Sequence, residues 1–261
     1  MRLKDKVAII TGGGSGMGEA VSRLFGKEGA KVVIGDINEQ LSKDIASQIS
    51  NSGNDAMAIK LDVVDENQVK NMVDLVINKY KRIDILINCV GKAHFGPSED
   101  LTIEEWNNII NINLTGPFLC CREVGKVMKK QKSGKIVNFG STGGLSGVPY
   151  MAHYTAAKHG IVGLTKALAV EWGKYNINVN CICPGATQTA MLLQSTTEEY
   201  RKERIKRIPL KRLGFPEDQA NVALFLSSPE SDYVSGAHIC VDGGIYAMSP
   251  ATGTDVLEEK S

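Results

Sequence analysis

Short apolar runs alternate with longer amphipathic segments along the whole chain. An apolar run of five or six residues is typical of a strand that is buried on both faces of a parallel sheet. Seven such runs predict strands at Val7–Thr11, Lys31–Asp36, Ala56–Lys60, Ile83–Asn88, Lys135–Gly140, Ile177–Cys183 and His238–Val241. Helical periodicity fills the intervals, above all at Asn67–Tyr80, Ile103–Gln131 and Tyr154–Lys174. This alternation predicts right-handed crossovers and an α/β fold whose doubly wound parallel sheet is flanked by helices.

A glycine-rich segment, TGGGSGMG at 11–18, follows the first predicted strand, and a helical pattern continues at 19–27. A strand, a glycine loop and a helix in this order aim backbone N–H groups and a helix N-terminus at a pyrophosphate. The spacing is T-G-x-x-x-G-x-G rather than G-x-G-x-x-G, with glycines at Gly12, Gly16 and Gly18. The alternative is a flexible loop with several left-handed turns. The second predicted strand ends at Asp36, whose carboxylate can accept hydrogen bonds from an adenosine ribose diol, and this favours a nucleotide site.

Tyr154 and Lys158 are four residues apart in a predicted helix, so their side chains share one face. A free phenol titrates near ~10 and is a poor base at neutral pH. A cation held beside a phenol favours the phenolate and makes it a usable base. Because Y-x-x-x-K alone is a weak signal, the alternative is a surface pair on an amphipathic helix. Ser141 lies thirteen positions before Tyr154, and Asn113 lies earlier. The motifs that accompany these residues along the chain favour a catalytic site, although Asn113 alone would be a helix-surface amide.

The ordered motifs of the chain resemble the short-chain dehydrogenase/reductase family over nearly the whole length. The resemblance rests on TGGGSGMG at 11–18, Asp36, Asp62-Val63, NCVG at 88–91, NLTG at 113–116, Ser141, YTAAK at 154–158, PGATQT at 184–189 and VDGG at 241–244. Any one of these motifs is modest evidence, whereas the ordered set is specific. The resemblance implies a single-domain Rossmann fold with a seven-stranded parallel sheet, a nicotinamide dinucleotide cofactor, and oxidoreductase activity on a secondary alcohol or a ketone.

The resemblance also implies four catalytic roles. Tyr154 is expected to take the proton of an alcohol and, in reverse, to donate it to a carbonyl oxygen. Lys158 is expected to stabilise the phenolate and to bond the nicotinamide ribose, and Ser141 to stabilise charge on the substrate oxygen. Asn113 is expected to kink its helix and to keep a water that passes the proton onward from Lys158.

The charge at the end of the second strand favours NAD over NADP. Asp36 suits a ribose 2′-OH and repels a 2′-phosphate. NADP-preferring members usually carry Arg or Lys at positions that are here Gly13, Gly14, Ser15 and Ile37. The same features argue against the NADPH-dependent 3-oxoacyl carrier-protein reductases of the family. By resemblance, Asp62 and Val63 flank the adenine, and the alternative for Asp62 is a turn after the third strand.

One segment departs from the family pattern, which usually reads N-N-A-G where this chain reads Asn88-Cys89-Val90-Gly91. Val90 adds two methyl groups where Ala is usual, and we interpret this as variation within working enzymes. Asn88 is expected to tie the central strand to the cofactor loop through backbone bonds. The expected cofactor-binding residues are Gly12, Ser15, Gly16, Met17, Gly18, Asp36, Ile37, Asp62, Val63, Asn88, Val90, Gly91, Tyr154, Lys158, Pro184, Gly185, Thr187 and Thr189.

By resemblance, the substrate pocket is expected to form from residues that follow the NCVG, Ser141 and PGATQT motifs. Its candidate contacts are Lys92, His94, Thr142, Gly143, Tyr150, His153, Met191 and Leu192. A substrate lid is expected at about 187–213, and it carries the basic residues Arg201, Lys202, Arg204, Lys206, Arg207, Lys211 and Arg212. These charges favour an anionic substrate such as a hydroxy acid or a hydroxyacyl-CoA. The alternative is a solvated helix face that nearby glutamates balance.

Composition narrows the function further. A chain of 261 residues with 43% hydrophobic content can bury one sizeable core, expected at 1–248, and the polar segment 249–261 is expected to be a mobile tail or a subunit-contact arm. The formal net charge of +1 argues against nucleic acid or a membrane surface as a partner. No apolar stretch approaches the ~20 residues of a membrane-spanning helix, and the N-terminus lacks a signal-peptide layout. The six cysteines lack metal-ligand spacing, which predicts no metal site, and reduced thiols suit the cytoplasm.

Two rival functions can be compared with an NAD-dependent dehydrogenase. An extended-type relative, an epimerase or dehydratase on nucleotide sugars, would need glycine where this chain has Ser15, and a large C-terminal substrate region. A non-catalytic NAD-binding subunit or sensor would not need the catalytic side chains, all of which are present. Similar proteins are usually tetramers, so we expect a homotetramer that pairs the predicted helices at 103–131 and 154–174.

Overall fold

Seven strands form one parallel sheet in the order β3-β2-β1-β4-β5-β6-β7 in the computed structural model, which describes residues 1–248. The strands are β1 (Val7–Thr11), β2 (Lys31–Asp36), β3 (Ala56–Lys60), β4 (Ile85–Asn88), β5 (Gly134–Phe139), β6 (Ile177–Pro184) and β7 (His238–Val241). The strand order reverses between β1 and β4, which are neighbours in the sheet. This doubly wound Rossmann topology confirms the expected fold class, and ligands of such sheets bind near the reversal.

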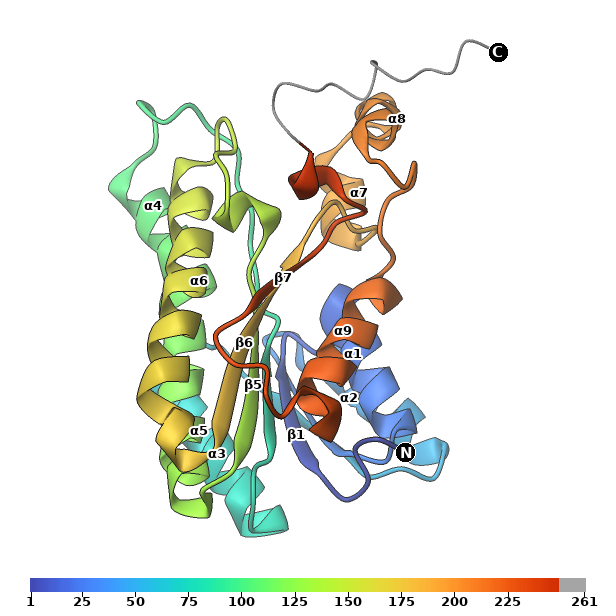
Figure 1. Cartoon of the computed structure of the whole chain (residues 1–261), viewed down its shortest axis with the longest axis vertical. Coiled ribbons are helices and arrows are strands. Elements are labelled where there is room, and N and C mark those ends of the chain that lie inside the picture. The colour runs from blue at the N-terminus through green and yellow to red at the C-terminus, as the bar shows by residue number, and fades with distance from the viewer. Residues whose placement is uncertain (249–261) are drawn as a thin grey trace.

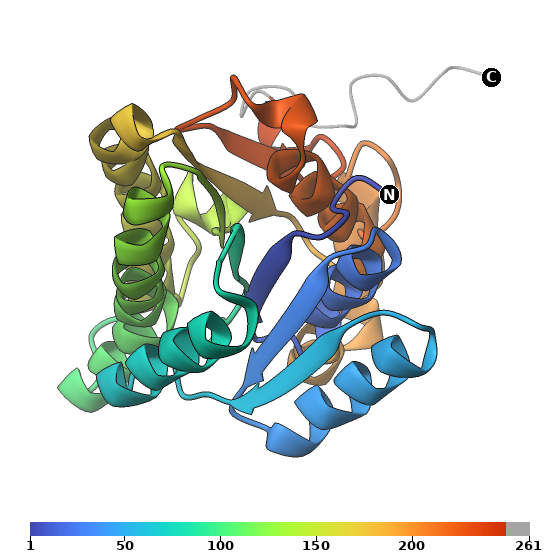
Figure 2. The same cartoon turned by 90° about the horizontal axis from the view of Figure 1, so that it is seen from below.

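Helices cover both faces of the sheet (Figure 1 and Figure 2). One face is covered by α1 (Gly16–Lys27), α2 (Glu39–Asn51) and α9 (Pro216–Ser227). The opposite face is covered by α3 (Glu66–Tyr80), α5 (Gly116–Gln131) and α6 (Ala152–Trp172), and α4 (Ile103–Ile110) packs against α6. Two short helices, α7 (Ala190–Ser195) and α8 (Glu198–Arg207), follow β6 and lie beyond its end (Figure 1). No helix in residues 1–248 is long and apolar enough to cross a membrane.

The alternation of side chains along β1 divides the core between these two faces. Val7 and Ile9 pack with residues of α3, α5 and α6, whereas Ala8 and Ile10 pack with residues of α1, α2 and α9. All four side chains are at most 1% exposed. A strand that is buried on both faces needs no polar alternation, which explains why this segment of the sequence is a continuous apolar run.

The observed elements differ from the sequence-based expectations mainly at their ends. β4 begins at Ile85 rather than Ile83, and α6 begins at Ala152 rather than Tyr154. The helical pattern expected over Ile103–Gln131 is interrupted at its centre by a π-helical turn at Asn111–Thr115, which separates α4 from α5 at the place where Asn113 is expected to kink the helix. Periodicity records which face of a helix is apolar, and it carries little information about how the backbone is hydrogen-bonded. The tail expected at 249–261 lies outside the described residues.

Candidate active site

The motif residues gather at the carboxyl edge of the sheet, as the parallel topology requires. The glycine loop follows β1, Asp36 ends β2, Asn88 ends β4, Ser141 follows β5 and Pro184 ends β6. Because β1, β4 and β5 are adjacent strands, the segments that follow them lie side by side. Residues that are far apart in the sequence therefore form one candidate site.

The glycine loop is packed too closely to carry side chains at key positions. An ideal Cβ on Gly18 would lie 2.0 Å from the carbonyl oxygen of Gly12, and Gly12 has a φ of +68°. Ser15 is the N-cap residue of α1, and its hydroxyl makes no capping bond within the described residues. The backbone N–H groups at the start of α1 can therefore bind an anion, and this cradle fits the pyrophosphate of a dinucleotide.

Two backbone N–H groups hold the Asp36 carboxylate at the end of β2. Its Oδ2 accepts from Gly14 at 3.0 Å and its Oδ1 accepts from Asn38 at 3.0 Å. An ideal Cβ on Gly14 would lie 3.0 Å from the same Oδ2, so any side chain at position 14 would push against the carboxylate. Residues 11–18 contain no Lys or Arg, so the site presents a fixed negative charge without a cation in the loop beside it.

Tyr154 and Lys158 share one face of α6, as their spacing predicts. The Lys158 ammonium lies 5.6 Å from the centroid of the Tyr154 ring, and the lysine side chain is 4% exposed. Its Nζ donates to the carbonyl oxygen of Phe139 at 2.9 Å. Sequence reasoning missed this partner because every residue offers the same carbonyl. A buried positive charge in this position stabilises negative charge on the neighbouring phenol.

Ser141 begins a short 3₁₀ turn, Thr142–Gly144, that rests on α6. Ser141 Oγ accepts from the Gly143 N–H at 3.0 Å, so the hydroxyl proton is free to be donated to a substrate oxygen. An ideal Cβ on Gly143 would lie 3.4 Å from Ser141 Oγ and 3.6 Å from Tyr154 Cε1. Ser141 and Tyr154 therefore both lie beside Gly143.

Asn113 is fully buried in the π-helical turn. Its Nδ2 donates to the carbonyl oxygens of Ile109 at 3.0 Å and Lys92 at 2.8 Å, and its Oδ1 accepts from the Lys92 N–H at 3.2 Å. Pro117 has no N–H to donate to the carbonyl of Asn113, four residues earlier, so the regular helix bond cannot form there. The amide side chain and the proline together account for the break between α4 and α5.

Asn113 also lies close to Lys158, through the backbone segment after β4 that its side chain binds. An ideal Cβ on Gly91 would lie 3.4 Å from Asn113 Oδ1 and 3.8 Å from Lys158 Nζ. The backbone at Gly91 is thus enclosed by these two side chains, and a larger residue there would separate them. Asn113, Ser141, Tyr154 and Lys158 consequently converge on one region, which is an arrangement suited to acid–base chemistry.

A family model described as enoyl-(acyl carrier protein) reductase matches residues 12–246. A 3-oxoacyl-[acyl-carrier-protein] reductase of Thermotoga maritima is 40% identical to the chain, and the alignment covers 94% of this chain and 99% of the relative. The chain belongs to the short-chain dehydrogenase/reductase family. The resemblance drawn from the motifs is thereby confirmed.

Other similar members of the short-chain dehydrogenase/reductase family carry different names. An NAD-dependent glycerol dehydrogenase of Listeria innocua is 37% identical, with 93% of this chain and 94% of the relative covered. The structure of levodione reductase matches with a TM-score of 0.92 and 35% identity, covering 95% of this chain and all of that chain. A 7α-hydroxysteroid dehydrogenase complexed with NADH and 7-oxo glycochenodeoxycholic acid matches with a TM-score of 0.91 and 33% identity, covering 93% and 95%. The similarity supports an oxidoreductase of the alcohol–ketone class.

Other expected cofactor contacts of this dehydrogenase/reductase lie around the same edge. Thr189 accepts from the Leu192 N–H at 3.4 Å and so caps α7. The Thr189 methyl group lies 3.4 Å from an ideal Cβ on Gly16, so the glycine loop and the start of the lid face each other. Asp62 Oδ1 accepts from the Val64 N–H at 3.1 Å. Asp62 thus forms the turn that was its alternative role, and a contact with adenine stays a prediction.

Asn88 and Val90 are held in ways that sequence reasoning missed. Asn88 Nδ2 donates to Asn138 Oδ1 on β5 at 2.9 Å, and Asn138 Nδ2 donates to Thr165 Oγ1 on α6 at 3.0 Å. The Asn88 side chain therefore ties β4 to β5 and α6. The neighbouring Cys89 N–H donates to the carbonyl oxygen of Thr11, at the start of the glycine motif, at 3.1 Å, in line with the expected backbone connection. The sequence signal that could have indicated this contact is the asparagine near the end of each of two apolar strands, Asn88 and Asn138. Val90 Cγ2 lies 3.1 Å from an ideal Cβ on Gly12, so the larger residue fits because position 12 has no side chain.

The predicted substrate contacts differ in their access to solvent. Those that are exposed are Lys92, His94, Tyr150 and Met191, those that are half-buried are Thr142 and Leu192, and those that are buried are Gly143 and His153. His153 is 0% exposed, and its ring lies edge-on to that of His94 with the centroids 5.7 Å apart. A fully buried ring has no surface for a substrate, so the expected direct contact by His153 is not supported.

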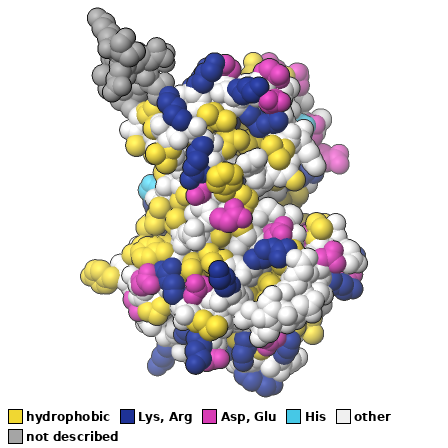
Figure 3. Space-filling view, turned by 90° about the vertical axis from the view of Figure 1, so that its right-hand side faces the viewer, with side chains coloured by type: hydrophobic (Ala, Val, Ile, Leu, Met, Phe, Trp, Pro, Cys, Tyr) yellow, Lys and Arg dark blue, Asp and Glu magenta, His cyan; other side chains and the backbone are white. Residues whose placement is uncertain are grey.

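Most basic side chains of the lid are paired or bonded locally. Ion pairs join Lys202 to Glu198 at 2.7 Å, Lys206 to Glu203 at 2.6 Å and Arg212 to Asp218 at 2.6 Å. Arg201 donates to the carbonyl oxygens of Leu193 and Thr196, near the end of α7. Positive and negative side chains lie close together on the upper part of this side of the molecule (Figure 3). The solvated-face alternative therefore describes the lid better than a concentrated anion-binding surface.

The His, Cys, Asp and Glu side chains were also candidates for a metal site or a reactive thiol. Residues 1–248 contain no group of three or more His, Cys, Asp or Glu side chains placed to hold a metal ion. All six cysteines are free thiols. Burial raises the pKa of the Cys121 thiol to about 12, so this thiol stays protonated at neutral pH. The phenol of Tyr154 is the better candidate for proton transfer.

The buried His153 ring generates a prediction about stability. Burial lowers the pKa of His153 from its usual 6.5, and His94 adds to this effect while Glu105 opposes it. The unfolded chain therefore binds a proton more readily than the folded chain, so the stabilising effect of neutral His153 is present above about pH 6.5 and is lost as the pH falls. We expect the free energy of unfolding to decline less between about pH 7 and about pH 5 in His153→Leu than in the wild type.

Urea unfolding curves at a series of pH values measure this difference. His159 lies on the same helix but is exposed, so His159→Gln is the matched control and is expected to follow the wild-type curve. An unchanged pH dependence in His153→Leu would show that this ring is not what couples stability to pH.

Proposed function

We propose that the protein is an NAD-dependent oxidoreductase that interconverts a secondary alcohol and a ketone, with Tyr154 as the general acid/base. The observation that carries the proposal is the buried Lys158 ammonium, 5.6 Å from the Tyr154 ring, with Ser141 and Tyr154 both beside Gly143. Oxidation of an alcohol removes a proton from oxygen and a hydride from carbon. A site for this reaction needs a base, a group that stabilises the alkoxide, and a hydride acceptor beside both.

The four side chains divide the proton chemistry among them. The Tyr154 phenolate accepts the alcohol proton, and the Lys158 charge stabilises that phenolate before the transfer. Ser141 donates a hydrogen bond from its hydroxyl group to the substrate oxygen and keeps its proton, since its own oxygen already accepts from the Gly143 N–H. Asn113 holds the backbone next to Gly91 and leaves its own carbonyl available to a water that exchanges the proton with Lys158. The nicotinamide cofactor, when bound, accepts or supplies the hydride.

Asp36 supports NAD rather than NADP as the cofactor. The carboxylate is fixed by two N–H groups at the end of β2, so it cannot turn away from a 2′-phosphate without breaking both bonds. Two similar proteins have names that contain NAD or NADH, the glycerol dehydrogenase and the 7α-hydroxysteroid dehydrogenase complex. A second candidate is reduction of a 3-oxoacyl thioester, which the 40% identity to a 3-oxoacyl-[acyl-carrier-protein] reductase favours.

A hydroxy acid or a hydroxyacyl-CoA is the more specific candidate for the substrate. The paired charges of the lid give this class little support, so it depends on Lys92, an exposed cation whose backbone is held by Asn113 beside the site. The rival assignment, a non-catalytic NAD-binding subunit or sensor, keeps the same cofactor site without turnover. The six free thiols are consistent with a reducing compartment, and on this basis we place the protein in the cytoplasm.

The exposed apolar side chains of α4, α5 and α6 support a homotetramer. Ile103 on α4 is 74% exposed, Phe118 on α5 is 41% exposed and Val170 on α6 is 86% exposed. Large apolar side chains on the outer faces of adjacent helices are typical of surfaces that pack against another subunit. These helices are the ones expected to pair in similar proteins.

The first prediction from the proposed function concerns turnover. We expect NADH formation near about pH 9 with at least one class among secondary alcohols, polyols, hydroxysteroids, hydroxy acids and hydroxyacyl-CoA thioesters, and slower reaction with NADP. Tyr154→Phe removes only the acid/base hydroxyl, so kcat/KM should fall by about 10²- to 10⁴-fold. Tyr233→Phe is the control, because Tyr233 is fully exposed and away from the site.

The outcomes of this screen separate the candidates. Equal turnover in Tyr154→Phe and wild type would overturn the catalytic role of Tyr154. Tight NADH binding without turnover on any class would favour the sensor, and preference for NADP with a 3-oxoacyl thioester would favour the second candidate.

The second prediction concerns the charge of the lid. Because Lys206 is paired with Glu203 on an exposed helix, the double variant Lys206→Glu and Arg207→Glu should leave kcat/KM for an anionic substrate within about twofold of the wild type. Lys92→Gln is the contrasting variant, and it should raise KM for the same substrate if the anionic class is correct. A large loss of kcat/KM in the double variant would show that the basic residues of the lid bind the anionic substrate.

The third prediction concerns assembly. Sedimentation velocity should give four times the 28.2 kDa mass of one chain for the wild type. Val170→Lys places a charge on the proposed contact and should lower this mass, whereas Leu75→Lys, at a half-exposed position of α3, should not. A wild-type protein that sediments as a monomer would contradict the tetramer.

A further inference from the structure

The segment after β7 is fixed in a tight turn before it reaches Tyr246. Gly243 and Gly244 have φ values of +71° and +90°, which favour glycine. The Asp242 carboxylate accepts from the Gly244 N–H at 2.9 Å and from the Tyr246 N–H at 2.8 Å. An ideal Cβ on Gly185 would lie 2.7 Å from Asp242 Cα, so this turn packs directly on the segment that follows β6. The position of Tyr246 is therefore set by the turn.

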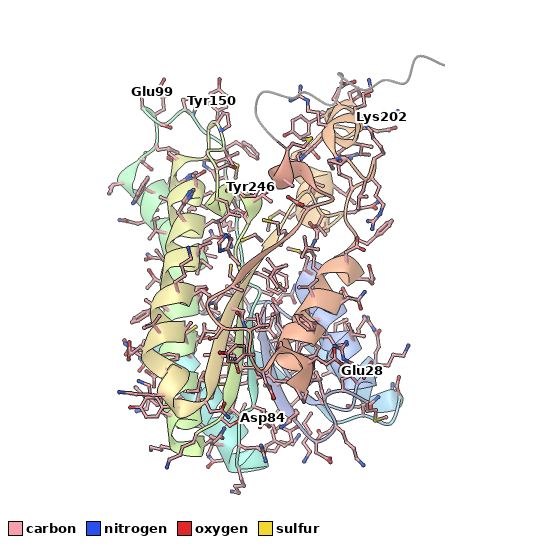
Figure 4. The ribbon with its side chains drawn as sticks, in the orientation of Figure 1. Glu28, Asp84, Glu99, Tyr150, Lys202 and Tyr246 are labelled. Carbon is pink, nitrogen blue, oxygen red and sulfur yellow. The ribbon has the colours of Figure 1, made fainter. Side chains whose placement is uncertain are left out.

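The side chain of Tyr246 reaches the turn that carries Ser141. Its hydroxyl donates to the carbonyl oxygen of Leu145 at 3.3 Å, across 101 residues of sequence. In Figure 4, Tyr246 lies between the part of the molecule that carries Tyr150 and the part that carries Lys202. The bond thus joins the C-terminal segment, on the side of the lid, to the opposite side of the candidate site.

Leu145 is the last residue of a compact hydrogen-bonded unit. The Gly144 N–H donates to the Ser141 carbonyl at 2.8 Å, and the Leu145 N–H donates to the Thr142 carbonyl at 3.1 Å. The Gly143 N–H holds Ser141 Oγ in the same unit at 3.0 Å. A contact that fixes the Leu145 carbonyl therefore restrains the Ser141 hydroxyl as well.

We propose that Tyr246 is a positioning residue, which holds the Ser141 turn in place through the Leu145 carbonyl. The Tyr246 side chain is 44% exposed, so its role does not depend on filling the core. The inference rests on the proposed function, in which Ser141 donates a hydrogen bond to the substrate oxygen. Because that bond strengthens as charge develops, misplacement of Ser141 lowers kcat more than it raises KM.

The test compares full-length wild type, Tyr246→Phe and the control Tyr233→Phe, which removes a fully exposed hydroxyl. We expect Tyr246→Phe to lower kcat by about fivefold, the factor that corresponds to the loss of one neutral hydrogen bond, with the Kd for NADH unchanged. Hydrogen–deuterium exchange of a peptide that covers 141–148 should also become faster in Tyr246→Phe, and stay at the wild-type rate in Tyr233→Phe.

The two readouts keep the inference separate from the proposed function. Unchanged exchange in the 141–148 peptide overturns the restraint by Tyr246, whether or not a substrate has been found. Faster exchange with unchanged kcat overturns the positioning role and leaves only a structural contact. If the wild type turns over no substrate, the proposed function fails, and the exchange measurement still decides whether Tyr246 restrains the turn.

Discussion

Seven strands that run in the same direction bring all their carboxyl ends to one edge of the sheet, and the candidate site depends on this constraint. The glycine loop, Asp36, Asn88 and Ser141 each follow or end a different strand. None of them could meet another through local structure, because the helices between the strands separate them in sequence. The hydrogen bonds between neighbouring strands fix the register of the sheet. The short segments that follow the strands then have little conformational freedom, so the residues at this edge are held in place.

Buried amide groups provide the next level of precision. Asn113 holds both polar groups of the Lys92 backbone, and Asn138 links Asn88 to Thr165 on the covering helix. A buried polar group that loses its hydrogen-bond partner lowers the stability of the fold. Each of these amide side chains is therefore restricted to few conformations. The candidate catalytic side chains lie on elements that these bonds fix. The bond from Tyr246 to the Leu145 carbonyl adds a further contact on the solvent-exposed side of the Ser141 turn.

Sequence reasoning was most successful where the physical signal is local. The apolar runs predicted all seven strands. The signal is clearest in the central strands such as β1, which are buried on both faces and are therefore almost entirely apolar. The spacing of Tyr154 and Lys158 correctly placed both side chains on one helical face. Periodicity alone did not reveal the π-helical turn within 103–131, although the family resemblance pointed to a kink at Asn113. The turn depends on the bonds of the Asn113 amide and on the absence of an N–H in Pro117. The sequence also did not decide whether the basic residues of the lid bind a substrate or pair with nearby glutamates, since ion pairing depends on side-chain conformation.

The sequence by itself determined the fold class, the family and the identity of the residues that can carry the chemistry. These follow from hydrophobic periodicity, from glycine spacing and from the side-chain types available, all of which are written along the chain. Only the tertiary structure decided which groups these residues contact: the Phe139 carbonyl for Lys158, Gly14 for Asp36, and the Leu145 carbonyl for Tyr246. Two of these three partners are backbone carbonyls and the third is a backbone N–H. Every residue supplies such groups equally, so no sequence pattern can single one out before the chain has folded.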